Sequence, residues 1–306
     1  MKTSRWLQMS VTLASLGAAA QAQAQTFPTH DAWAPMYCAS DVMTDRFNDE
    51  LEAVDERDLV GDLAAPTGAL TADAQFLYLR VRVEKDPIPE AGARPFGWGI
   101  LIDTDRNLAT YEVQVQVNGI AGVVSLFRNT VVTLANSPAD PPDEPAVAAF
   151  SMSSHARSVV APGSTYGGDS DHFLEFAVPW VELEKVGITT TTPVVLWAAT
   201  STSLAGLNGD FACWVNGTGE PTLSGTGSRR TVLDPYVDSD GDGYTDRREY
   251  EGDSDPKNAG SKPAGDPDSL ELAGAGGCQA AGGGIGLASL ALAAFWRRRS
   301  RPSRRS

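Results

Sequence analysis

Basic residues are few in this chain of 306 residues, with 24 Lys and Arg against 39 Asp and Glu and a formal net charge of −15. Eight of the basic residues lie in two terminal segments that we expect to be removed, one at each end of the chain. The mature protein would keep 16 basic and 39 acidic residues, a net charge of −23. A surface this acidic argues against nucleic acid as a partner, because few cations remain to neutralise phosphates.

Motifs of catalysis are also lacking. The sequence has no nucleophile elbow, no HExxH and no phosphate-binding loop. Its three histidines are His30, His155 and His172. A grouping of Ser154, His172 and Asp169 can be drawn on paper, as it can in any chain of this size. We therefore expect no enzymatic activity.

Cysteine is rare: Cys38, Cys213 and Cys278 are the three in the chain. Cys38 and Cys213 fall near the two ends of the region expected to fold, and in an oxidising compartment they could form a disulfide. Two buried free thiols are the alternative.

Export is predicted by residues 1–25, which combine a basic start with a mostly apolar core at 6–20. Small residues offer cleavage after Ala22 or Ala24. The apolar run is too short for a membrane-spanning anchor, so we expect a cleaved secretory signal.

Helical patterning is scarce before residue 216, where short alternating segments are separated by polar turns instead. In 110–117, for example, valines alternate with Gln114 and Gln116, which we expect to face outward. The expected strands are 75–83, 97–102, 110–117, 120–127, 130–134, 172–178 and 193–201. Many short strands of this kind predict an all-β fold, a two-sheet antiparallel, jelly-roll-like β-sandwich.

The strongest chemical signal is a loop with the spacing of a calcium site. Acidic residues occupy its positions one, three, five, nine and twelve, and Gly243 stands at position six, where the chain must turn. Pro235 argues against an entering helix, whereas 245–251 could form a short exiting one. The predicted calcium ligands are Asp238, Asp240, Asp242, the carbonyl of Tyr244, Asp246 and Glu249.

The chain after the sandwich is divided by composition. Two stretches rich in Gly and Pro or Asp are expected to be flexible linkers, which would leave the calcium loop outside the folded body. The expected order is signal peptide 1–25, sandwich 26–216, linker 217–234, calcium-binding loop 235–256, linker 257–273 and sorting tail 274–306.

The tail combines three features: small residues around Cys278, a mostly apolar segment at 280–296, and an arginine cluster from Arg297 onward. The apolar segment is a hydrophobic tail helix of borderline spanning length, and the arginines would stay on the cytoplasmic side. Such a tail would halt export and remain in the membrane while a sorting protease cleaves near Cys278. A plain C-terminal anchor is the alternative.

Two stretches resemble known bacterial families. Residues 274–305, with Gly277-Cys278, the apolar segment and the arginine cluster, resemble the MYXO-CTERM sorting tails. That resemblance implies processing at Cys278 and attachment to the outer membrane at the cell surface. Residues 238–256 resemble a thrombospondin type 3 calcium repeat, present here in a single copy, which implies a calcium clip.

Residues 40–200 are similar to carbohydrate-binding module family 9 and DOMON-like sandwiches, through 76–83, 97–105 and 174–180. The similarity implies a β-sandwich that binds sugar or haem in some relatives.

We therefore expect a cell-surface calcium-binding protein whose sandwich binds carbohydrate of the envelope or matrix. A structural or adhesive protein that binds another surface protein, or a haem-binding protein, is the alternative. Asp103 and Asp105 could be oxygen ligands, although a self-bonded turn is the preferred interpretation. Four tryptophans could stack on sugars or lie in the core, with the core preferred for each: Trp98, Trp180, Trp197 and Trp214.

Overall fold

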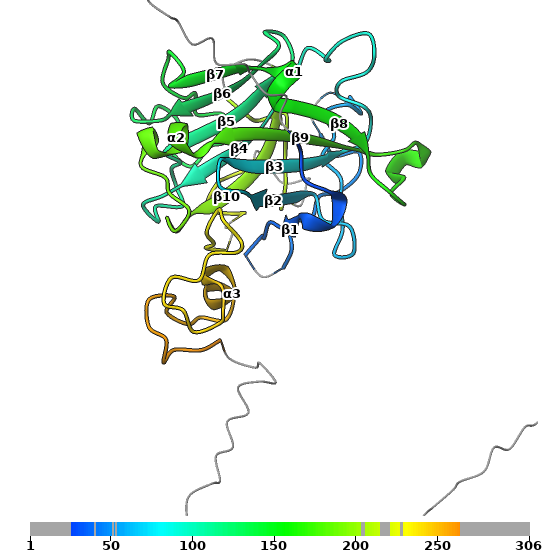
Figure 1. Cartoon of the computed structure of the whole chain (residues 1–306). Coiled ribbons are helices and arrows are strands. Elements are labelled where there is room, and N and C mark those ends of the chain that lie inside the picture. Colours follow the sequence, from blue (N-terminus) through cyan, green and yellow to red (C-terminus); the bar gives the residue numbers. More distant parts are fainter. Residues whose placement is uncertain are drawn as a thin grey trace, which may run out of the picture. The chain divides into compact units, whose positions relative to one another are not determined.

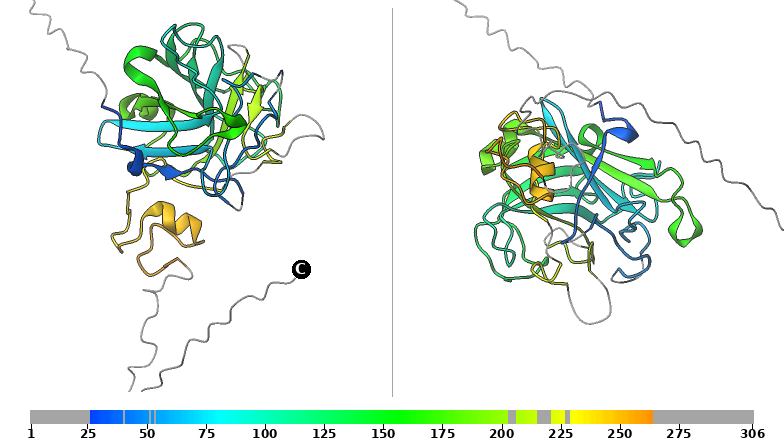
Figure 2. Two further views of the ribbon diagram at one scale, coloured as in Figure 1. Left: turned by 90° about the vertical axis from the view of Figure 1, so that its right-hand side faces the viewer. Right: turned by 90° about the horizontal axis from the view of Figure 1, so that it is seen from below.

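The computed structural model describes residues 26–263 apart from 40, 51, 53, 203–205, 215–220 and 227–228. Its strands form two antiparallel sheets, which confirms the predicted all-β sandwich. The sheets can be followed in Figure 1 and, from two further directions, in Figure 2. Along the described chain, no helix combines the length and apolar character needed to cross a membrane.

The first sheet has five strands in the order β1-β2-β3-β9-β8. The long neighbours β3 and β9 pair over their whole length, with Leu79 opposite Phe176. The five strands are β1 (Ala34–Pro35), β2 (Gly68–Ala72), β3 (Phe76–Val83), β9 (His172–Pro179) and β8 (Ala156–Val160).

The second sheet has six strands in the order β11-β10-β4-β5-β6-β7. These are β11 (Asp210–Phe211), β10 (Val195–Ser201), β4 (Gly97–Asp103), β5 (Val113–Asn118), β6 (Val123–Arg128) and β7 (Ala148–Ser151). The helices are short and lie between strands or after them: η1 (His30–Ala32), α1 (Met152–His155), η2 (Tyr166–Gly168), α2 (Trp180–Leu183), η3 (Glu184–Val186) and α3 (Asp246–Glu251).

The core lies between the sheets, where alternate residues of each strand meet. Leu77, Leu79 and Val81 of β3 join Ile100 and Ile102 of β4 in one fully buried cluster. This burial is the main driving force for the sandwich, at roughly 25 cal/mol per Å² of apolar surface.

The outward faces of the strands are covered as well. Gln114 and Gln116 point away from the core as expected, yet both are fully buried. On the other sheet, the guanidinium of Arg80 lies between the rings of Trp33 and Phe173, at 3.9 and 4.1 Å from their centroids. The N-terminal segment therefore covers the outer face of the five-stranded sheet.

The predicted strand at 130–134 is wrong. The backbone amides of Thr133 and Leu134 donate to Oδ1 of Asp140, at 2.8 and 2.6 Å. These amides are therefore not available for hydrogen bonds to a neighbouring strand. Val131 and Leu134 are exposed, so the apolar pattern there reports no buried strand.

The first expected linker, 217–234, is not flexible where the structure describes it. Leu223, Val232 and Leu233 are fully buried against the sandwich. Thr231 also pairs with Val194 in an antiparallel bridge. The composition of this segment predicted a flexible linker, but a few buried apolar residues among many Gly, Thr and Ser are enough to pack the segment against the sandwich.

A disulfide joins Cys38 and Cys213, whose Cα atoms lie 5.7 Å apart across 175 residues of sequence. Beside it, the amide of Cys213 donates to the carbonyl of Thr44 at 2.9 Å. The alternative of two free thiols is therefore not what the structure contains.

Candidate metal centre

The loop from residue 238 is shaped by its own aspartates. Asp238 accepts hydrogen bonds from the amides of Gly241 at 2.7 Å and Gly243 at 3.0 Å. Both glycines have a positive φ, of 75° and 95°, which a residue with a Cβ adopts only at a cost. The glycines thus permit the curl that brings alternate side chains to one side.

Three carboxylates converge inside this curl. Asp238, Asp240 and Asp242 each place one oxygen within 4.8 Å of the others. Asp240 and Asp242 use Oδ1 to accept from backbone amides two residues ahead, at 3.2 and 2.9 Å. Their Oδ2 atoms are buried and have no hydrogen-bond partner among the described residues.

Glu249 of helix α3 is near enough to this group for Asp240 and Asp242 to affect its pKa. It is 0% exposed, and its Oε2 atom has no partner within the described chain, while Oε1 accepts from the Ser254 hydroxyl at 3.3 Å. Burial, and then the charges of Asp240 and Asp242, raise the pKa of Glu249 to about 7. Among the described residues, acids and no Lys or Arg are the charged groups that shift its pKa.

Asp246, another predicted ligand, forms hydrogen bonds within the loop. Its two oxygens accept from the amide and hydroxyl of Ser239, at 2.7 and 2.6 Å, and so close the loop. The amide of Tyr244 donates to Asp242 at 2.9 Å. The carbonyl of Tyr244 stays a predicted ligand. As expected, a short helix leaves the loop, and Thr245 caps it by accepting from the Arg248 amide.

The loop also contacts the sandwich, which the sequence did not indicate. The buried Arg247 of α3 donates to the carbonyl of Pro35 on β1 and lies 4.9 Å from the centroid of the Tyr37 ring. It pairs with Glu251 at 2.9 Å. The expectation of a loop outside the folded body is therefore wrong.

A second contact supports the same attachment. The hydroxyl of Tyr236, which precedes the loop, donates to the carbonyl of Ala32 at 3.0 Å. Arg230 lies over the ring of Tyr250, 5.0 Å from its centroid. Both contacts involve residues on either side of the acidic group, so the loop is held at both ends.

The four tryptophans considered for sugar stacking lie in or near the core. Trp98 and Trp197 are fully buried, Trp180 is 7% exposed and Trp214 is partly buried. The indole of Trp98 donates to the carbonyl of Glu56 at 2.9 Å. The interpretation of these residues as core is the correct one.

The structure does not assemble the catalytic grouping drawn from the sequence. Ser154 is bonded to His155 at 2.9 Å, and His172 instead meets Ser158 at 3.1 Å. Asp86 lies 3.6 Å from His172, but at the same Nδ1 atom that faces Ser158. A triad needs the two ring nitrogens in different roles, so this arrangement is not one.

Asp103 and Asp105 form the self-bonded turn. Asp103 accepts from the amides of Asp105 and Arg106, both at 2.8 Å. Glu112 lies beside them, and one oxygen of each of the three acids falls within 4.8 Å of the others.

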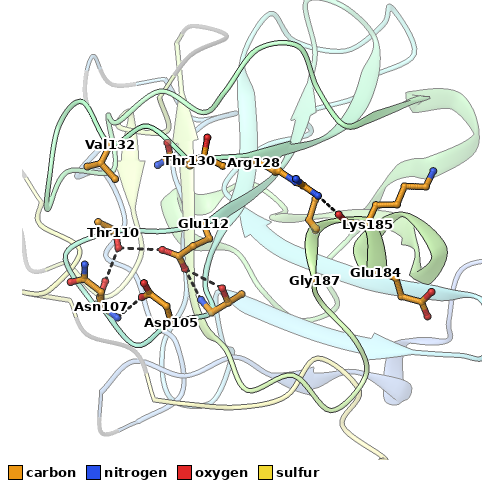
Figure 3. Close-up of a pocket in the computed structure, with 13 residues that line it drawn as sticks. Asp105, Asn107, Thr110, Glu112, Arg128, Thr130, Val132, Glu184, Lys185 and Gly187 are labelled. Atoms are coloured by element: carbon orange, nitrogen blue, oxygen red, sulfur yellow. Dashed lines mark hydrogen bonds between the residues drawn. The ribbon is translucent and has the colours of Figure 1, made fainter.

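A polar pocket of about 760 Å³ opens next to this turn. Figure 3 shows Asn107, Thr110 and Glu112 on one side and Arg128 reaching the carbonyl of Lys185 on the other. Thr110 donates to Glu112 at 3.2 Å. The lining is therefore rich in groups that bind hydroxyls.

Several expectations fall outside the described residues: the signal peptide 1–25, Cys278, the tail helix and the arginine cluster. Comparisons with known proteins add no relative. No family model matches the chain, and neither the curated proteins nor the solved structures contain a significant match.

Proposed function

We propose that this chain is an exported, surface-anchored protein whose loop 238–249 binds calcium and is thereby fastened to the β-sandwich. The observation that carries the proposal is Glu249, a fully buried carboxylate with an unpartnered oxygen, whose pKa is raised by burial and by the charges of Asp240 and Asp242. Burying a charge without a partner costs several kcal/mol. A bound cation removes that cost.

The donor set favours calcium over other metals. Carboxylates and backbone carbonyls are hard oxygen ligands, and no His or Cys belongs to the group. Calcium accepts six to eight oxygens in irregular arrangements, whereas magnesium demands a near-ideal octahedron. We expect a dissociation constant of roughly 10⁻⁵–10⁻³ M, the range from sensors to extracellular modules.

Calorimetric titration of the full chain with calcium tests the site. Wild type should release or absorb heat on binding, and the double variant Asp240→Ala, Glu249→Ala should lose that heat. Glu90→Gln, which changes an exposed acid far along the sequence from the loop, should bind as wild type does. If the double variant gives the same heat of calcium binding as wild type, the loop is not the calcium site.

Carbohydrate binding is a second candidate function, and the polar pocket of Figure 3 supports it. A volume of about 760 Å³ can hold a small saccharide. Asn107, Glu112 and Arg128 supply the amide, carboxylate and guanidinium groups that bind sugar hydroxyls. Glycan-array binding by the full chain, lost in Asn107→Ala and Arg128→Ala, would support this function. No glycan binding on the array, either with or without calcium, would contradict this function.

Anchoring is proposed from the sequence of the tail. Cys278 would be the processing site for a sorting protease, after which the protein stays on the outer membrane facing outward. The variant Cys278→Ser should accumulate unprocessed or misplaced, as fractionation and surface labelling would reveal. Normal surface display of this variant would refute the sorting role of Cys278.

A further inference from the structure

A third acidic group lies within the sandwich itself, away from the calcium loop. Asp45, Asp49 and Asp210 each place one carboxylate oxygen within 4.8 Å of the others. They come from distant parts of the chain, since Asp210 begins strand β11 and the other two precede β2. The fold alone brings them together.

Asp45 is the most unusual member of this group. It is 7% exposed, and neither of its carboxylate oxygens has a hydrogen-bond partner in the described part of the chain. As a carboxylate, Asp45 therefore carries the cost of a buried charged group without a partner.

The neighbours of Asp45 are held in place by the backbone. Asp210 accepts from the amides of Leu59 at 2.5 Å and Phe211 at 2.8 Å, which orients its carboxylate. Asp58 accepts from the amide of Asn48 at 2.8 Å, is fully buried, and has an Oδ1 atom with no partner among the described residues.

Electrostatics agrees with this geometry. Burial, and then neighbouring acids, raise the pKa of Asp45 far above its ordinary value. Burial raises the pKa of Asp49 to about 6, that of Asp58 to about 9 and that of Asp210 to about 8. The group thus needs positive charge to be ionised at neutral pH.

The protein supplies only part of that charge. The buried guanidinium of Arg57 interacts with Asp210, but its charge is shared with Glu52, which lies 3.8 Å away, and with Glu50. Arg46 lowers the pKa of Asp49 by a smaller contribution than burial raises it. Negative charge therefore remains in excess.

We propose that Asp45, Asp49 and Asp210 form a second divalent-cation site, for calcium, inside the sandwich. The donors are carboxylate oxygens, which suit a hard cation. Asp45, but neither Asp49 nor Asp210, also lines an open cavity of about 580 Å³. The ion would join the 45–49 segment to β11, next to the disulfide of Cys38 and Cys213.

Equilibrium dialysis of the full chain against calcium, after treatment with a chelator, tests the second site by stoichiometry. Wild type should bind two ions per chain. The loop variant Asp240→Asn, Glu249→Gln should bind one ion, and Asp45→Asn should also bind one. Asp45→Asn is the better single change because it removes no hydrogen bond of the described structure. Glu90→Gln is the control and should bind two.

Thermal unfolding guards against a variant that simply fails to fold. Without calcium, Asp45→Asn should unfold at the same temperature as wild type or higher, because Asp49 and Asp210 no longer face another buried acid. Adding calcium should raise the unfolding temperature of wild type by more than it raises that of Asp45→Asn. The second site is refuted if Asp45→Asn still binds as many ions as wild type, or if the loop variant alone abolishes all binding. If the loop does not bind calcium, the loop variant will bind as many ions as wild type, so that outcome is distinguishable from failure of the second site.

Discussion

The guanidinium of Arg247 donates a hydrogen bond to the backbone carbonyl of Pro35, which lies 212 residues earlier in the chain. Arg247 belongs to α3, two residues before Glu249, so the helix that carries the last predicted calcium ligand also contacts β1. Ordering the loop and seating it on the sandwich are therefore linked: an ion that fixes α3 also fixes Arg247 against Pro35.

Replacing Arg247 should uncouple calcium binding from the stability of the sandwich. Arg247→Ala removes a charge-assisted hydrogen bond and the contact with the Tyr37 ring, worth about 1–3 kcal/mol together. We expect a smaller calcium-induced rise in melting temperature, measured by circular dichroism. Lys257→Ala is the control, because Lys257 is an exposed cation beyond the end of α3. Equal calcium responses in the two variants would contradict the coupling.

Gly243 should be irreplaceable in the loop. Its φ of 95° is unfavourable for a residue with a Cβ, although no atom would obstruct that Cβ. Gly243→Ala should therefore weaken calcium binding through backbone strain of about 1–2 kcal/mol, roughly a tenfold loss of affinity. Gly260→Ala, outside the curl and without a positive φ, should bind calcium normally. Calorimetry that gives both variants the wild-type affinity would rule out the strain argument.

The disulfide should contribute substantially to stability. It closes a loop of 175 residues, and cross-links of this kind typically stabilise a fold by about 2–4 kcal/mol. Replacing Cys38 and Cys213 together by Ser should lower the free energy of unfolding by that amount in urea titrations. A double variant as stable as wild type would show that the contacts around Thr44 suffice by themselves.

Glu84 should give the protein a component of stability that falls as pH rises. Burial, and then the charge of Asp55, raise the pKa of Glu84 from 4.5 to about 7. Between these pH values the folded protein keeps a proton that the unfolded chain has released, so stability declines with rising pH and then levels off. Glu84→Gln should match wild type near pH 4 and exceed it at pH 8, on the order of 1–3 kcal/mol. A stability difference that does not change with pH would contradict this.

The long central strands were predictable because their alternation is regular. Expected strands at 75–83, 97–102 and 193–201 correspond closely to β3, β4 and β10. The strand expected at 120–127 begins only at Val123, since the amide of Ile120 is held by the Asn118 side chain at 3.0 Å.

The edge strands could not be found in the same way. Strands β1 and β11 have two residues each, too few for any periodicity, and β7 and β8 have few large apolar residues. The alternation of apolar and polar residues along a strand also indicates which residues share a face of the sheet, but not which segments cover that face. The burial of Gln114 and Arg80 therefore depends on distant segments that the local pattern cannot reveal.

The convergence of Asp238, Asp240 and Asp242 was predictable, because these residues are close in sequence and their spacing is fixed by a single turn. The contact of Arg247 with Pro35 is non-local and leaves no mark in that spacing. The acidic group of Asp45, Asp49 and Asp210 is also non-local, and only the paired sheets bring it together. In this protein, an acidic group that lies within one loop was predictable, and an acidic group assembled by the fold was not.

Amide hydrogen exchange of the full chain, with calcium and with a chelator, tests the central claim most directly. The account predicts that calcium slows exchange across 238–252 and also near Met36, whose amide lies next to the Pro35 carbonyl that Arg247 contacts. Slower exchange in both places would show that the ion orders the loop and fastens it to the sandwich. Exchange that is identical with and without calcium in the loop would contradict the claim.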